Sequence, residues 1–84
     1  MPTISLFNGI ATMMFQADKE HNPPHIHAFY GSNEASFKID DGSILAGYLP
    51  NNAEKLVKKF VIKYKEDLLN MWNKCSYYKL PPII

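Results

Sequence analysis

The sequence predicts an α+β fold, in which an antiparallel five-stranded meander packs on one long C-terminal α-helix. In the first half, turn-forming residues recur about every six to ten positions, and the short stretches between them are rich in β-branched and aromatic residues. In the second half, apolar residues recur at steps of three and four, which is the period of an amphipathic helix. A sheet with one apolar face needs a covering layer, and the helix would supply it.

The strand boundaries follow from the turns. Asn8-Gly9 is the preferred pair for a two-residue hairpin turn in which both residues have positive φ. The polar segment 16–24 ends in two prolines, which cannot donate to a sheet, and therefore predicts a long loop. Further turns are expected at Gly31-Ser32-Asn33 and at Asp40-Asp41-Gly42. We expect strands at about 3–7, 10–16, 25–30, 34–39 and 43–48.

A single helix is predicted over about residues 52–75. Asn51 is a suitable N-cap residue, with Glu54 three positions later as in a capping box. About 24 helical residues span roughly 36 Å, enough to cross a small sheet. The tail, residues 76–84, contains Pro81-Pro82 and is expected to be extended, docked on a sheet edge or on another molecule.

Length and composition indicate one domain, residues 1–84, in the cytoplasm. The chain has one cysteine, and we see neither a signal segment nor an apolar run long enough to span a membrane. The formal net charge is +1, and all nine basic residues are lysine. Without arginine the chain lacks the planar guanidinium group that binds the edge of guanine with two hydrogen bonds, so sequence-specific DNA binding is not a favoured function.

All three histidines lie in the segment HNPPHIHAFY, residues 21–30. In a strand, His25 and His27 share one face, and Ile26 and Ala28 share the other. If the apolar set faces the helix, both imidazoles point away from it. A turn at residues 32–33 would place His25 opposite Asp40 and His27 opposite Lys38, with Ser36 on the same face.

Three interpretations of this segment remain open. In the first, His21, His25 and His27 bind a divalent metal such as zinc, with Glu34 as another candidate ligand. The metal-free alternative is a catalytic or ligand-binding site for a phosphate compound or nucleotide. There His25, beside Asp40, is the charged acid, His27 is the neutral base, and Lys38 stabilises negative charge.

The third interpretation is structural. His21 and Asn22 would bond the loop backbone, the prolines would set the strand's entry angle, and the paired histidines would fill a sheet surface or a partner interface. The residues considered for binding, outside the catalytic set, are His21, Asn22, Ser36 and Asp40.

The predicted helix carries a basic band opposite its apolar stripe, formed by Lys55, Lys58, Lys59, Lys63 and Lys65. Such a band could follow a nucleic-acid backbone or an acidic protein, although most such bands are solvated faces. Trp72 and Cys75 are expected in the core, because both follow the apolar spacing of the helix.

Four segments, MPTIS, HNPPHIHA, DDGSILAGYLP and KEDLLNMW, resemble in that order the small bacterial proteins grouped as domain of unknown function 4160. The resemblance implies a compact sheet with one long helix, and a gene often placed beside a second small gene in a toxin–antitoxin or defence arrangement. It implies no settled activity. The matching positions are His21, Asn22, Pro23, Pro24, His25, His27, Gly47, Leu49, Pro50 and Trp72.

This chain differs from the proteins that it resembles, which use arginine freely, in having only lysine as a basic residue. Our first interpretation is a cytosolic interaction module, one member of a toxin–antitoxin-like, immunity or defence-related pair, which binds a small protein or a second copy of itself. The alternative is a phosphodiester-acting enzyme or a protein that binds a small phosphate compound, a nucleotide or RNA, with or without a metal. The first interpretation implies no catalysis.

Overall fold

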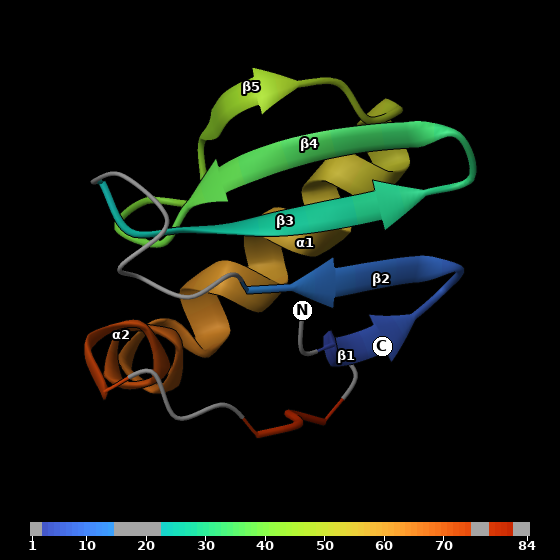
Figure 1. Cartoon of the computed structure of the whole chain (residues 1–84). Coiled ribbons are helices and arrows are strands. Elements are labelled where there is room, and N and C mark those ends of the chain that lie inside the picture. The colour runs from blue at the N-terminus through green and yellow to red at the C-terminus, as the bar shows by residue number, and fades with distance from the viewer. Residues whose placement is uncertain (1–2, 15–22, 75–77, 82–84) are drawn as a thin grey trace.

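The structure, a computed structural model, describes residues 3–14, 23–74 and 78–81. Its five strands form one sheet in the order β1-β2-β3-β4-β5, and every neighbouring pair is antiparallel (Figure 1). The predicted five-stranded meander is therefore confirmed. The strands are β1 (Thr3–Phe7), β2 (Ile10–Met13), β3 (His25–Tyr30), β4 (Asn33–Lys38) and β5 (Ile44–Gly47).

The first hairpin forms as its turn residues predict. Asn8 has a φ of 49° and Gly9 a φ of 76°, so both central residues adopt positive φ. β2 ends at Met13, earlier than expected, and the last two positions of the predicted strand, 15 and 16, lie outside the described residues.

The second hairpin differs from the predicted register by two residues. Its turn residues are Gly31 and Ser32, so that Tyr30 pairs with Asn33 and His25 with Lys38. Gly31 has a φ of 60° and takes the first turn position, which most other residues would occupy only under strain. A shift of two residues leaves every side chain on its predicted face but gives it a different cross-strand neighbour.

β5 depends on a glycine at its end. The pairing of β4 with β5 shifts register between Ser36 and Phe37. Gly47 has a φ of 84°, and a Cβ atom at this position would collide with the carbonyl oxygen of Glu34. The same oxygen accepts a hydrogen bond of 3.0 Å from the backbone N–H of Tyr48. Only glycine satisfies both the backbone angle and the close contact.

Two helices, α1 (Asn51–Lys63) and α2 (Lys65–Lys74), replace the single long helix that was predicted. The chain bends at Tyr64, whose φ and ψ are −109° and 25°, although its N–H still bonds to the carbonyl of Phe60. The predicted side-chain cap is also wrong, because Pro50 occupies the N-cap position and no side chain caps α1.

The bend keeps the helical segment within a compact molecule. The longest principal extent of the molecule is 30 Å, shorter than a straight helix of about 24 residues at 1.5 Å each. Without a bend, the second half of the helix would project past the sheet with its apolar residues in water. Instead α1 crosses behind the sheet and α2 turns at its end (Figure 1), where Leu68, Met71 and Trp72 are buried.

The core lies between one face of the sheet and the helices. Ile26, Ala28 and Phe37 contribute from the middle strands, and the ring of Phe7 lies 5.2 Å from that of Phe60 of α1. In the part of the chain that the structure describes, every buried side-chain nitrogen or oxygen has a hydrogen-bond partner.

Part of the predicted tail closes one sheet edge. The backbone N–H of Leu80 donates to the carbonyl of Ile4 at 2.8 Å, and the Ser5 hydroxyl donates to the carbonyl of Leu80 at 3.0 Å. For residues 78–81, docking on a sheet edge is therefore confirmed. Across the described ranges, no helix is both long and apolar enough to pass through a membrane.

Candidate functional site

The site is built on the sheet face that α1 leaves uncovered, which we call the open face. Cross-strand pairing arranges this face in rows, because directly paired residues point to the same side. One row joins Met13, His27, Ser36 and Ala46, a second joins Leu6, Ala11, Phe29 and Glu34, and a third pairs His25 with Lys38.

Both imidazoles are on the face opposite Ile26 and Ala28, which are fully buried, as strand alternation predicts; the expectation that both point away from the predicted helix over 52–75 is wrong for His25, whose ring lies against Trp72 of α2. The histidines are nevertheless half-buried and not simply solvent-facing. The rings of His25 and His27 are 5.1 Å apart, and the ring of His25 lies 5.2 Å from that of Trp72. Nothing in the sequence indicated this contact with α2, because it depends on the bend at Tyr64.

His25 is fixed by its own backbone turn. Its Nδ1 lies 2.8 Å from the carbonyl oxygen of Pro23. A carbonyl can only accept a hydrogen bond, so Nδ1 carries the proton and, in the neutral ring, the lone pair is on Nε2. The proline pair thus has a structural role that sets the tautomer of the histidine that follows it.

His27 has two polar neighbours on β4. Its Nδ1 lies 3.5 Å from Oε2 of Glu34 and 3.4 Å from Oγ of Ser36. The imidazole is the more enclosed partner, with 14% of its side chain exposed against 53% for Glu34. Because the carboxylate and the hydroxyl meet the same ring nitrogen, the trio does not form a relay from carboxylate through imidazole to a serine nucleophile.

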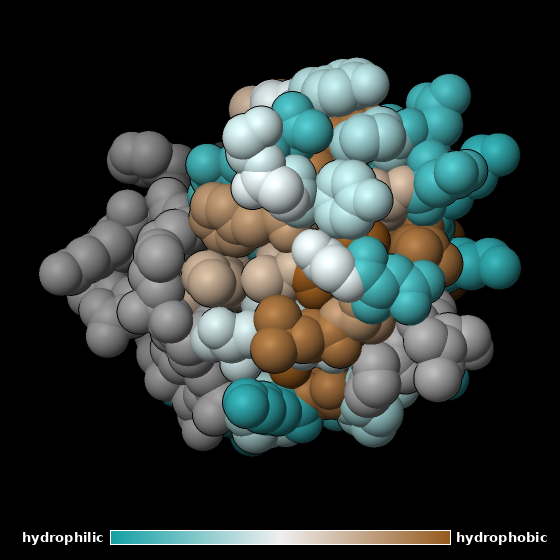
Figure 2. Space-filling view, turned by 90° about the vertical axis from the view of Figure 1, so that its right-hand side faces the viewer, coloured by the Kyte–Doolittle hydropathy of each residue, from teal (hydrophilic) through white to brown (hydrophobic). Residues whose placement is uncertain are grey.

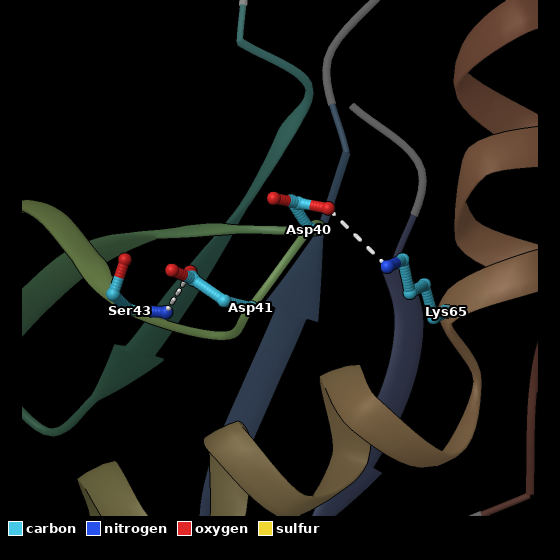
Figure 3. A network of polar contacts seen from close by, with 4 residues as sticks. All are labelled: Asp40, Asp41, Ser43 and Lys65. Atoms are coloured by element: carbon cyan, nitrogen blue, oxygen red, sulfur yellow. Dashed lines mark hydrogen bonds and ion pairs between the residues drawn. The ribbon is translucent and has the colours of Figure 1, made fainter.

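The observed register of β3 and β4 differs from the predicted pairing of the histidines with Asp40 and Lys38. Asp40 lies beyond the end of β4 and is not the cross-strand partner of His25; its Oδ1 accepts a hydrogen bond of 3.2 Å from Nζ of Lys65, at the start of α2 (Figure 3). Lys38 is directly opposite His25 and not opposite His27. The predicted pairs His25–Asp40 and His27–Lys38, on which the acid and base roles were based, are therefore wrong.

The neighbouring Asp41 has a local structural role. Its Oδ1 accepts a hydrogen bond of 2.9 Å from the backbone N–H of Ser43 (Figure 3). This bond, which favours the carboxylate, lowers the pKa of Asp41 below its ordinary value. Asp41 therefore shapes the turn between β4 and β5, whereas Asp40 connects this turn to α2 through Lys65.

His21 and Asn22, predicted as ligand and binding residues, lie outside the described residues. Among the residues that are described, no three histidine, cysteine, aspartate or glutamate side chains gather as a metal site would require. Of the predicted metal set, the structure places His25 and His27 side by side; a zinc site would need further donors.

Two hollows border the open face within the described ranges. One, of about 200 Å³, lies on β4 and β5 and is lined by Glu34, Ala35, Ser36, Ala46 and Gly47. The other, of about 210 Å³, lies between β1 and the tail and is lined by Thr3, Ser5, Leu6, Lys79 and Leu80. Sequence reasoning had not included Leu6, Ala11, Met13 or Phe29 in the site, although strand alternation places them on the same face as the histidines.

The fold and the site define a small α+β protein with a histidine-bearing open sheet face. Residues 9–73 match the family model of the domain of unknown function DUF4160, which is most of the chain. The chain belongs to this family, as the four sequence segments indicated. Comparison with curated proteins and with solved structures found no significant match. The family match includes both histidines, Gly47 and Trp72, while β1 and the tail lie outside it.

Proposed function

We propose that this protein is a cytoplasmic bacterial interaction module that binds a second small protein, as one member of a toxin–antitoxin-like, immunity or defence-related pair. The observation that carries the proposal is the composition of the open face. Its rows combine the apolar residues of β1, β2 and β3 with half-buried histidines and with the polar residues of β4, and protein interfaces likewise combine apolar surface with polar groups.

Leu6 is the strongest single feature of this surface. Its side chain is 62% exposed although it stands in a strand, and it pairs with Ala11, which in turn pairs with Phe29. Complete burial of an exposed leucine contributes about 1.5–3 kcal/mol, so burying the 62% of Leu6 that is exposed would contribute about 1–2 kcal/mol. The hollow beside Leu6 gives a partner side chain a place to pack.

The polar residues of the face would set specificity. His27 and Glu34 are held together at 3.5 Å, and Lys38 stands opposite His25. A partner that fails to match these groups leaves them desolvated and unpaired, which is how polar groups reject incorrect partners. The genetic setting of the family supports a partner encoded in the neighbouring reading frame.

The test is a pair of matched substitutions in the full chain. Leu6→Lys places a charge on the open face, whereas Ile62→Lys places one on α1 at a residue of similar exposure, 59%. Binding of the neighbouring gene product is measured by calorimetry. We expect Leu6→Lys to weaken the Kd at least tenfold, about 1.4 kcal/mol, and Ile62→Lys to leave it unchanged. Equal effects of the two changes would reject the open face as the contact surface.

A second candidate function rests on the histidine geometry itself. The Pro23 carbonyl fixes His25 with its lone pair on Nε2, which suits a base, and the carboxylate of Glu34 beside His27 suits an acid. Lys38, opposite His25, could stabilise a phosphate. These roles are the reverse of those expected from the sequence.

The double substitution His25→Ala/His27→Ala separates the two candidates. Under the catalytic proposal it abolishes hydrolysis of a generic phosphodiester such as bis-(p-nitrophenyl) phosphate, or abolishes nucleotide binding, while the melting temperature is retained. If the unchanged protein shows neither signal, the catalytic candidate is excluded.

A further inference from the structure

The outer surface of α1 carries a lysine face, formed by Lys55, Lys58, Lys59 and Lys63, all of which are exposed. These residues recur at steps of three and four, so they lie on one side of the helix. Buried Val57, Phe60 and Val61 hold the opposite side against the sheet and fix the rotation of the helix. Figure 2 shows hydrophilic residues gathered along its right-hand edge, the side on which α1 lies.

Charge is unevenly distributed along the chain. α1 contains four of the nine lysines and only one of the eight acidic residues, a net charge of +3, which leaves −2 for the rest of the chain. No acidic residue occurs between positions 55 and 65. Within the described ranges, Lys65 of α2 pairs with Asp40, but none of the four lysines of the face forms an ion pair.

We propose that the lysine face binds the phosphate backbone of single-stranded nucleic acid without reading its sequence. At 1.5 Å per residue, the lysines cover about 12 Å along the helix axis, long enough to meet several successive phosphates. The lysine ammonium acts as a point charge and cannot make the paired hydrogen bonds with which arginine binds the edge of a base, so the lysine face would contact the phosphates of the nucleic-acid backbone.

An apolar residue within the face favours a single strand over a duplex. Ile62 is 59% exposed and stands between the lysines. In a single strand the ribose and base surfaces are accessible to such a side chain, whereas in a duplex the bases are stacked and paired. The lysine face lies on the outside of α1, and the open face lies on the opposite side of the sheet, so this binding is separable from that of the protein partner.

The test is the salt dependence of binding to a fluorescently labelled 12-nucleotide oligouridylate, measured by anisotropy with the full-length protein. Each neutralised phosphate contributes about −0.7 to the slope of log K against log salt for single strands, so four lysines give about −2 to −3. The variant Lys55→Gln/Lys59→Gln should lose about half of this slope. A second pair, Lys58→Gln/Lys63→Gln, should give the same loss.

The matched control is Lys74→Gln/Lys79→Gln, which removes the same charge from two exposed lysines outside α1. It should retain the slope of the unchanged protein. An equal loss in the control would show that net charge alone drives binding, and absence of binding at 20 mM salt would reject the proposal. If a polyglutamate of the same length binds as tightly as the oligouridylate, the face recognises an acidic protein and the proposal is overturned.

Discussion

Gly47→Ala tests the close contact between β5 and β4 most sharply. At a φ of 84°, a left-handed backbone costs alanine about 1–2 kcal/mol. Its Cβ would also collide with the carbonyl oxygen of Glu34 and lie 2.8 Å from Cα of Ala35, so two strands must separate. Separation weakens the hydrogen bond from Tyr48 to Glu34, which contributes about 1 kcal/mol. The total is about 3 kcal/mol, a large fraction of the roughly 5–15 kcal/mol typical of a folded domain.

Gly31→Ala is the matched control. Gly31 also has a positive φ, of 60°, but a Cβ atom at this position would have no atom within 4 Å apart from those of its chain neighbours. This variant carries the backbone strain without the collision. Chemical unfolding should show a loss of about 1 kcal/mol for Gly31→Ala and about 3 kcal/mol for Gly47→Ala, with melting temperatures reduced by about 4–8 °C per kcal/mol. Losses that agree within about 0.5 kcal/mol would refute the steric explanation.

Three further predictions concern α2, the tail and the histidines. Trp72→Ala should lower the free energy of unfolding by about 3–5 kcal/mol, because Trp72 is only 5% exposed. The resonances of the His25 ring should also shift in NMR spectra, because this ring lies 5.2 Å from that of Trp72. A variant as stable as the unchanged protein would contradict the packing. Tyr78 donates a hydrogen bond to Asp67, and this bond raises the pKa of the phenol above its ordinary value of 10.0, so its contribution to the stability of the folded state is present below pH 10 and is lost as the pH rises. Tyr78→Phe should therefore flatten the pH dependence of the melting temperature between about pH 9 and 11. An unchanged pH dependence would argue against the contact. Untagged protein should retain bound zinc only if donors beyond His25 and His27 complete a site, and less than about a tenth of an equivalent by elemental analysis would end the zinc interpretation.

Much of the fold is readable from the sequence, because local residues specify it. Asn8-Gly9 has one favoured turn geometry, and strand alternation assigns His25 and His27 to the face opposite Ile26. The register of the second hairpin was missed because three consecutive residues can make a two-residue turn in more than one way. The left-handed angle at Gly31 decides between them, and the sequence alone does not reveal which angle forms.

The bend at Tyr64 could not be predicted, since neither proline nor glycine marks it. It accompanies a tertiary condition, the burial of Leu68, Met71 and Trp72 at the end of the sheet. For the same reason the environment of His25 was unforeseen. The members of the candidate site follow from strand periodicity, whereas their neighbours follow from the register and the bend.

The two proposed binding surfaces lie on opposite sides of the protein. The open face carries apolar side chains, with Leu6 of the edge strand β1 exposed, and α1 presents four lysines on the other side. A protein partner on the open face would leave the lysine face accessible, so the two partners could bind together. Competition between the neighbouring gene product and oligouridylate would contradict this arrangement.

The most direct test of the open face as the contact surface is methyl NMR of the complex with the neighbouring gene product. We expect the methyl groups of Leu6, Ala11 and Met13 to shift on binding, because they stand in adjacent rows of this face, while the methyl groups of Ile62 on α1 stay in place. Shifts confined to Ile62 and its neighbours, with Leu6 unmoved, would contradict the proposed function.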